Sequence, residues 1–176
     1  MAVGTASFEP EFGHHRPGVA AQVVALAGFL LVCFAAAGLG SLVTIHNIAT
    51  WYAGLAKPFF TPPSGVFPVA WTLLYFLMAV AGWLVWRQDA IDLDRRAALA
   101  AFAVQLILNV AWSWAFFGFH DPKLGLIVIV FLLGAIVWTV LAFRFVSRPA
   151  AVLMLPYLAW VCFATALNIG IVVLNP

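Results

Sequence analysis

Aromatic and amide side chains recur at helical spacing in three apolar stretches of this chain. One stretch carries Gln105, Asn109, Trp112 and Phe116. Another carries Tyr157, Trp160, Ala164 and Asn168, and an earlier one carries Trp71, Tyr75, Met78 and Gly82. Side chains three, four, seven and eleven positions apart lie on one face of an α-helix. Indole and phenol rings provide flat apolar surfaces and amides provide hydrogen bonds, so these faces predict a site for a flat, largely apolar ligand with a few polar edges.

A simpler interpretation stands beside this one. Asn and Gln in membrane helices often do no more than bond a neighbouring helix, and Trp or Tyr near a helix end often anchors in the membrane interface. The composition makes the membrane setting clear, because 66% of the 176 residues are hydrophobic and only 8% are charged. Such a balance excludes a soluble globular domain. The net charge of +2 comes without a basic stripe, so nucleic acid is not an expected partner.

Five apolar runs are long enough to cross a bilayer, which predicts an all-α membrane protein built as a bundle of five helices. They cover residues 19–45, 65–86, 97–117, 124–145 and 150–174, and residues 1–18 are expected to form a disordered tail. A cleaved signal peptide ending near Ala35 is the rival interpretation, although the apolar run continues beyond it. Only the connection between the first two spans is long, so we expect it to cap the bundle.

Helix geometry brings the three faces to a common depth. At 1.5 Å per residue, Trp71, Asn109 and Asn168 lie roughly 9 to 12 Å below the helix ends that meet the long connection. The sequence therefore predicts an aromatic cage with amide groups beneath that connection. Trp51 falls at its rim, and Trp138, in the middle of the fourth span, is expected to be core or pocket wall.

Charge placement predicts the orientation of the chain in the membrane. Six arginines fall at one end of the predicted bundle, at positions Arg16, Arg87, Arg95, Arg96, Arg144 and Arg148. Only Lys57 and Lys123 fall at the other end. In a bacterial inner membrane the arginine-rich end stays in the cytoplasm, so we expect the N-terminus inside and the C-terminus outside.

Motifs for conventional catalysis are missing from the sequence. There is no phosphate-binding glycine loop, no Ser-His-Asp candidate set and no acidic pair within a span. His46 and His120 are expected at the outer rim, where either could ligate the iron of a haem, although an interfacial histidine is the commoner outcome. No catalytic residue, metal site or required cofactor is predicted.

An ordered set of short motifs then makes the chain resemble a known family. The motifs run through Trp51, Tyr52, Lys57, Pro58, Pro62, Pro63, Phe67, Pro68, Trp71, Tyr75, Gln105, Asn109, Trp112, Phe116, Gly118, Pro156, Tyr157, Trp160 and Asn168. Together they resemble the tryptophan-rich sensory protein and translocator protein family (TspO/MBR), once called peripheral benzodiazepine receptors. The resemblance implies a five-helix bundle, often dimeric, that binds porphyrins, haem and synthetic ligands such as isoquinoline carboxamides in a pocket capped by the first connection.

The combined expectation for the ligand site rests on both arguments. It comprises Trp51, Phe67, Trp71, Tyr75, Asn109, Trp112, Trp138, Tyr157, Trp160, Ala164 and Asn168. Two departures from the family pattern matter. Phe59 and Phe60 stand where the family has a Trp before its double proline, so a role for that indole is not expected here. The segment after Asn168 lacks the Tyr and Arg tied to cholesterol recognition, so high-affinity sterol binding there is disfavoured.

The expected function is binding of a tetrapyrrole, a porphyrin or haem, in its sensing, transport or disposal. Light-dependent breakdown of porphyrin is one alternative, in which the ligand's own photochemistry acts beside Trp and Tyr. Transport of tetrapyrroles or sterols across the bilayer is another, although five spans without an inverted repeat do not favour alternating access. A homodimer through the third span is expected from Ala97 and Ala101, which packing within one bundle explains equally well.

Overall fold

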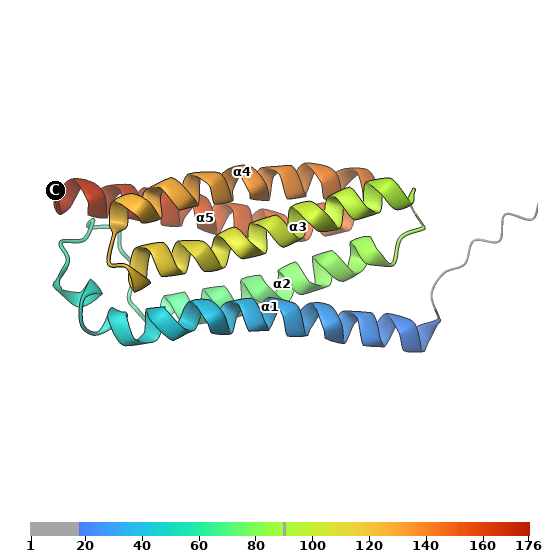
Figure 1. Cartoon of the computed structure of the whole chain (residues 1–176), viewed down its shortest axis with the longest axis horizontal. Helices are drawn as coiled ribbons and strands as arrows, with labels where there is room; N and C mark the ends of the chain where they lie inside the picture. Colours follow the sequence, from blue (N-terminus) through green and yellow to red (C-terminus); the bar gives the residue numbers. More distant parts are fainter. Residues whose placement is uncertain (1–17, 90) are drawn as a thin grey trace, which may run out of the picture.

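Five long α-helices make up the protein in this computed structural model, which describes residues 18–89 and 91–176 (Figure 1). They are α1 (Val19–Ile48), α2 (Val66–Trp86), α3 (Asp92–Ser113), α4 (Pro122–Val146) and α5 (Arg148–Leu174). A short 3₁₀ helix, η1 (Tyr52–Gly54), interrupts the long connection, and a π-helical turn, η2 (Trp114–Gly118), prolongs α3. All five helices are long and apolar enough to cross a membrane. The predicted five-helix bundle is confirmed, and the tail expected over residues 1–18 lies outside the described residues except for Gly18.

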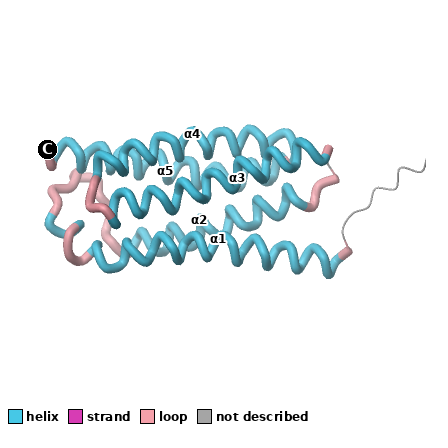
Figure 2. Tube along the Cα trace, in the orientation of Figure 1, coloured by secondary structure: helices cyan, strands magenta, loops and turns pink. Residues whose placement is uncertain are grey.

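The helices run alternately up and down and close into a ring. α1 packs against α2 and α3, α4 packs against α3 and α5, and α2 completes the ring through α5. Figure 2 shows the loops gathered at the two ends of the bundle. The connection 49–65 and the C-terminus share one end, here called the loop end, and the α2–α3 connection lies at the other. That other end carries Arg87, Arg95, Arg96, Arg144 and Arg148, and is called the arginine end.

Helices extend beyond the predicted spans because polar residues form their first and last turns. Asp92 starts α3 and pairs with Arg95 at 2.6 Å and Arg96 at 2.8 Å, so a segment expected to be loop is helical. At the start of α4 the Asp121 carboxylate accepts hydrogen bonds from the backbone N–H groups of Lys123 and Leu124, at 2.9 and 3.0 Å. Such capping satisfies N–H groups that have no partner within the helix.

The half of the bundle at the arginine end is densely packed. Phe102 of α3 stacks on Phe143 of α4 with ring centroids 5.8 Å apart, and its edge meets Phe29 of α1 at 6.2 Å. A Cβ placed on Gly82 would lie 2.8 Å from the Phe29 ring, so only glycine lets α1 and α2 approach this closely. Several side chains here have no exposed surface, including Met78, Ala79, Val85, Ala98 and Met154.

Small residues lie at helix contacts within the bundle. Of the two alanines named at the start of the third span, Ala97 is exposed and Ala101 is fully buried, so Ala101 packs within the bundle. Gly40 of α1 faces α3, where an added Cβ would lie 3.0 Å from Ser113 Oγ. Ala101 and Gly40 therefore lie where helices of the same chain pack together.

Candidate functional site

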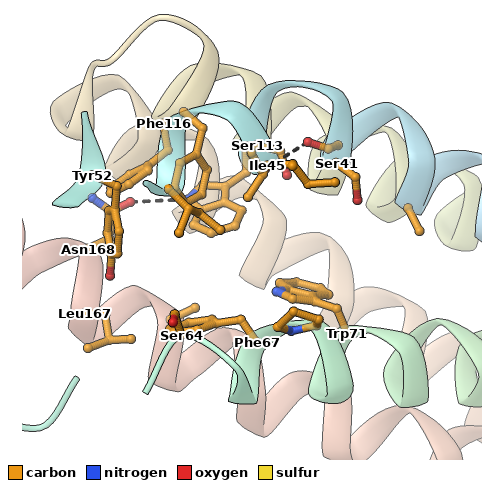
Figure 3. A pocket seen from close by; sticks show the side chains of 18 of the residues that line it. Ser41, Ile45, Tyr52, Ser64, Phe67, Trp71, Ser113, Phe116, Leu167 and Asn168 are labelled. Carbon is orange, nitrogen blue, oxygen red and sulfur yellow. Dashed lines mark hydrogen bonds between the residues drawn. The ribbon is translucent and has the colours of Figure 1, made fainter. Parts of the chain in front are cut away.

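A cavity of about 720 Å³ occupies the half of the bundle at the loop end. Its walls come from α1, α2, the end of α3 with η2, α5 and the connection above them. Figure 3 shows Ser41, Ile45 and Ser113 on one side of the open space, with Phe67 and Trp71 facing them from the other. Cavities of roughly 300–1,000 Å³ with apolar walls and a few polar groups are typical of small-molecule sites.

A chain of three polar side chains lies at the deep end of the cavity. The Tyr75 hydroxyl donates to Asn109 Oδ1 at 2.6 Å, and Asn109 Nδ2 donates to the Tyr157 hydroxyl oxygen at 2.8 Å. All three side chains are buried, from α2, α3 and α5 respectively. Because its amide oxygen bonds one tyrosine hydroxyl and its amide nitrogen bonds the other, Asn109 holds the two phenol rings in place.

Aromatic rings form the wall above this polar chain. Trp71 lies 5.8 Å from Tyr75 and 6.4 Å from Trp112 between ring centroids, and Trp112 lies 5.8 Å from Phe116. The Trp112 indole N–H donates to Asn168 Oδ1 at 3.3 Å, and Asn168 Nδ2 donates to the carbonyl of Pro122 at 2.8 Å. These rings give the cavity an aromatic surface, and hydrogen bonds fix the orientation of Trp112 within it.

The long connection closes the cavity as predicted. Tyr52 and Lys57 from this connection line it, and the Tyr52 ring lies 6.2 Å from that of Phe116. Burial raises the pKa of the Tyr52 hydroxyl above its usual value, so the group remains a neutral hydrogen-bond donor at physiological pH. At the end of α5, Gly170 lies so close to the Pro58 ring that any side chain there would overlap it.

Most residues of the predicted set meet at this cavity. Its lining includes Phe67, Trp71, Tyr75, Asn109, Trp112, Ala164 and Asn168. Tyr157 lies directly behind them, fully buried and bonded to Asn109. Side chains from α2, α3 and α5 therefore come together beneath the long connection.

Trp160 and Trp51 lie outside the lining. Trp160 packs edge-on against Phe67, which lines the cavity, with ring centroids 5.9 Å apart. The buried Trp160 indole N–H has no partner among the described residues. Trp51 instead stacks on His120 at 4.7 Å and meets Phe116 edge-on at 5.6 Å. Trp51 supports the cavity wall from behind.

The expectation that Trp138 is core or pocket wall is corrected. Half of its surface is exposed, and the cavity takes no lining residue from α4. The reason is that α4 turns a different stripe inward, running through Ile129, Leu132, Ile136 and Phe143. In a helix that is apolar on every side, the position of a Trp does not reveal which face packs.

Neither histidine considered as an iron ligand lines the cavity. His120 has a positive φ of 56° and bonds Asn47 Oδ1 through Nε2 at 2.7 Å. His46 lies in the last turn of α1, where its carbonyl accepts the Thr50 hydroxyl at 2.9 Å. Both sit at the rim as predicted, and the part of the chain that the structure describes holds no group of three potential metal ligands.

Sequence reasoning missed the contribution of α1. Gly40, Ser41 and Thr44 line the cavity although α1 carries no aromatic and polar stripe. The available signal was a cluster of small and hydroxyl-bearing residues within one turn of an otherwise aliphatic helix. Such residues leave space at a helix interface and supply polar atoms to it.

Comparisons with known proteins place these features in a family. The model of the TspO/MBR family matches residues 29–174. A tryptophan-rich protein TspO of Archaeoglobus fulgidus is 42% identical over 154 residues, covering 88% of this chain and 99% of the relative. The tryptophan-rich sensory protein of Cereibacter sphaeroides is 38% identical, covering 84% and 89%, and the human translocator protein is 36% identical, covering 80% and 84%.

Proposed function

This chain belongs to the TspO/MBR family of multi-pass integral membrane proteins, and we propose that its cavity binds a tetrapyrrole, either a porphyrin or haem. The observation that carries the proposal is the cavity wall itself. Trp71, Trp112 and Phe116 line a space of about 720 Å³ with aromatic rings. A large flat macrocycle gains most from stacking on such a wall.

Polar groups at two levels complement this apolar surface. The Asn109 chain lies at the deep end, and hydroxyls of Ser41, Thr44 and Ser113 lie around the sides. A porphyrin has an apolar face and polar groups at its edge, which is the distribution that the cavity offers. The names of two relatives, sensory protein and translocator protein, accord with a role in sensing or in transport.

Titration with protoporphyrin IX in detergent tests the proposal. Quenching of tryptophan fluorescence reports binding, and Trp71→Ala is expected to reduce affinity by about 1–3 kcal/mol through the lost stacking surface. Trp138→Ala is the matched control, since Trp138 is half exposed and away from the cavity. Equal affinity of wild type and Trp71→Ala, or an equal loss in both variants, would contradict the placement of the ligand.

Light-dependent breakdown of the bound porphyrin is a second candidate function. The observation favouring it is that Trp71, Trp112 and Tyr75 cluster at the cavity, with ring centroids of Trp71 within 6.4 Å of the other two. Electron-rich rings so placed lie beside any photoexcited ligand in the cavity. Loss of porphyrin absorbance under illumination in the presence of dioxygen tests it, and an unchanged rate in Trp71→Phe and Trp112→Phe would exclude participation of these rings.

The membrane orientation and the assembly complete the proposal. We propose that the arginine end faces the cytoplasm, because five described arginines gather there and only Lys57 and Lys123 lie at the loop end. Accessibility of a cysteine introduced at either end to a membrane-impermeant reagent tests this orientation.

Assembly as a homodimer would use the outward face of α3, where Ile107 is 68% exposed. Cross-linking between cysteines introduced on that face tests this assembly.

A further inference from the structure

Lys57 is the only charged side chain among the described residues that line the cavity. It extends from the connection at the loop end, and the rest of the lining consists of aromatic rings, aliphatic groups, hydroxyls and amides. A charge carried by a ligand therefore has one ionic partner within the cavity wall, and this partner is positive.

The Lys57 ammonium group has unused capacity. Nζ donates to the carbonyl oxygens of Ala53 and Leu55, both at 3.1 Å, and lies 4.8 Å from the centroid of the Tyr52 ring. An ammonium has three N–H donors, so one remains without a protein acceptor in the described chain. No carboxylate of residues 18–89 or 91–176 forms an ion pair with Lys57.

The backbone on both sides of Lys57 is fixed to the end of α5. The N–H of Ala56 donates to Asn175 Oδ1 at 3.0 Å, and Asn175 Nδ2 donates back to the carbonyl of Ala56 at 2.9 Å. On the other side Pro58 is buried, and its ring packs on Gly170. Because both neighbours are held, the cation is positioned before a ligand arrives, which lowers the entropy lost on binding.

We propose that Lys57 binds a carboxylate of the ligand, so that the cavity selects tetrapyrroles with free acidic side chains over their neutral esters. This inference rests on the proposed tetrapyrrole function and adds an orientation to it. The carboxylate edge lies at the loop end against Lys57, and the apolar macrocycle extends down along Trp71 and Trp112. An ammonium–carboxylate hydrogen bond is stronger than one between neutral groups, and the apolar wall reduces its screening by water.

Protoporphyrin IX and its dimethyl ester provide the test without any mutation. The two molecules share the macrocycle and differ in whether the propionates are charged. We expect wild-type protein in detergent to bind the acid about tenfold more tightly than the ester, the factor that corresponds to one charge-assisted contact at a partly exposed site. Raising the ionic strength should weaken binding of the acid and leave that of the ester unchanged.

Variants then assign the preference to one residue. Lys57→Met is expected to bring the acid-to-ester affinity ratio close to one, while Lys57→Arg keeps the cation and most of the preference. Lys123→Met is the matched control, because Lys123 lies at the same end of the bundle and outside the cavity lining. It should retain the wild-type ratio.

The outcomes separate this inference from the proposed function. The inference is wrong if wild-type protein binds acid and ester equally, or if Lys57→Met lowers both affinities alike. Either result would mean that Lys57 does not bind the ligand carboxylate, and it would leave the proposed tetrapyrrole site standing. If neither porphyrin binds, the proposed function itself fails. A ratio that collapses equally in Lys57→Met and Lys123→Met would assign the preference to the overall charge of the loop end and overturn the inference.

Discussion

The two halves of this bundle use the same five helices for opposite purposes. Toward the arginine end, Gly82 brings α1 and α2 together and the rings of Phe29, Phe102 and Phe143 fill the space between the helices. Toward the loop end, Gly40 and Ala164 are equally small, yet they border a cavity. The difference lies in the partners. In the first half bulky side chains point inward to meet the small residues, whereas in the second half the rings stand along the walls.

The largest expected effect comes from removing a ring in the packed half. Phe102→Ala should lower the free energy of unfolding by about 3 kcal/mol, because the ring is 4% exposed and its loss leaves an unfilled space beside Phe143. Unfolding by sodium dodecyl sulfate in mixed micelles measures it. Phe131→Ala is the control, since Phe131 is 66% exposed and should change stability little.

Removing a ring from the half at the loop end, which holds the cavity, should cost less unfolding free energy. Phe67→Ala removes a ring that already borders open space, so we expect less than half the cost of Phe102→Ala. Equal destabilisation by the two substitutions would mean that both halves depend on packing to the same degree.

Breaking the polar chain should have the next largest effect. Asn109→Leu leaves the hydroxyls of Tyr75 and Tyr157 without their partner, at a cost of about 2 kcal/mol in unfolding free energy. Adding Tyr75→Phe and Tyr157→Phe to that variant removes the stranded hydroxyls and should recover part of the loss. No recovery in the triple variant would show that Asn109 acts through its shape and not through its hydrogen bonds.

A buried amide one helical turn away should behave in the opposite sense. Gln105 is fully buried, and neither its Nε2 nor its Oε1 has a hydrogen-bond partner among the described residues. Gln105→Leu is therefore expected to raise the unfolding free energy by about 1 kcal/mol. A destabilised Gln105→Leu, measured beside Asn109→Leu in the same micelles, would refute this distinction between the two amides.

The smallest expected effect on stability comes from breaking the contact between the connection 49–65 and Asn175. Asn175→Ala removes both hydrogen bonds to Ala56, and because they lie at the exposed loop end we expect a cost below about 1 kcal/mol. Hydrogen exchange of the Ala56 amide should nevertheless become several-fold faster. Asn47→Ala is the control, since Asn47 bonds Val43 and His120 at the same end; similar acceleration at Ala56 in both variants would argue against a specific clamp.

Helix geometry and topology explain which parts of the site were predictable. Tyr75, Asn109 and Trp112 lie on polar or aromatic faces of their helices, and the rise per residue places them at one depth, so their meeting follows from sequence. Trp138 has no such neighbours on α4, whose uniform apolarity hides its packing face. Trp160 shares the correct stripe on α5, but it packs against the Phe67 ring and does not line the cavity, and no sequence pattern reveals this contact.

Contacts between distant segments were beyond the sequence. Asn175 bonds Ala56 across 119 positions, and Gly170 accommodates Pro58 without any local signal for either pairing. The length of the connection 49–65 was enough to predict that it covers the bundle. The contacts that hold it against α5 are visible only in the structure.

The length of α1 has a consequence for the membrane around the cavity. Its 30 residues extend about 45 Å, against about 30 Å for the hydrocarbon core of a typical bilayer. A helix with this mismatch tilts or projects into the headgroup region, and a change in bilayer thickness alters its tilt. Only Cys33, Ala36 and Gly40 of α1 are buried, so α1 is the least buried of the five helices. Ser41 and Thr44 lie on this helix and line the cavity, so a change in the tilt of α1 would shift one wall of the cavity.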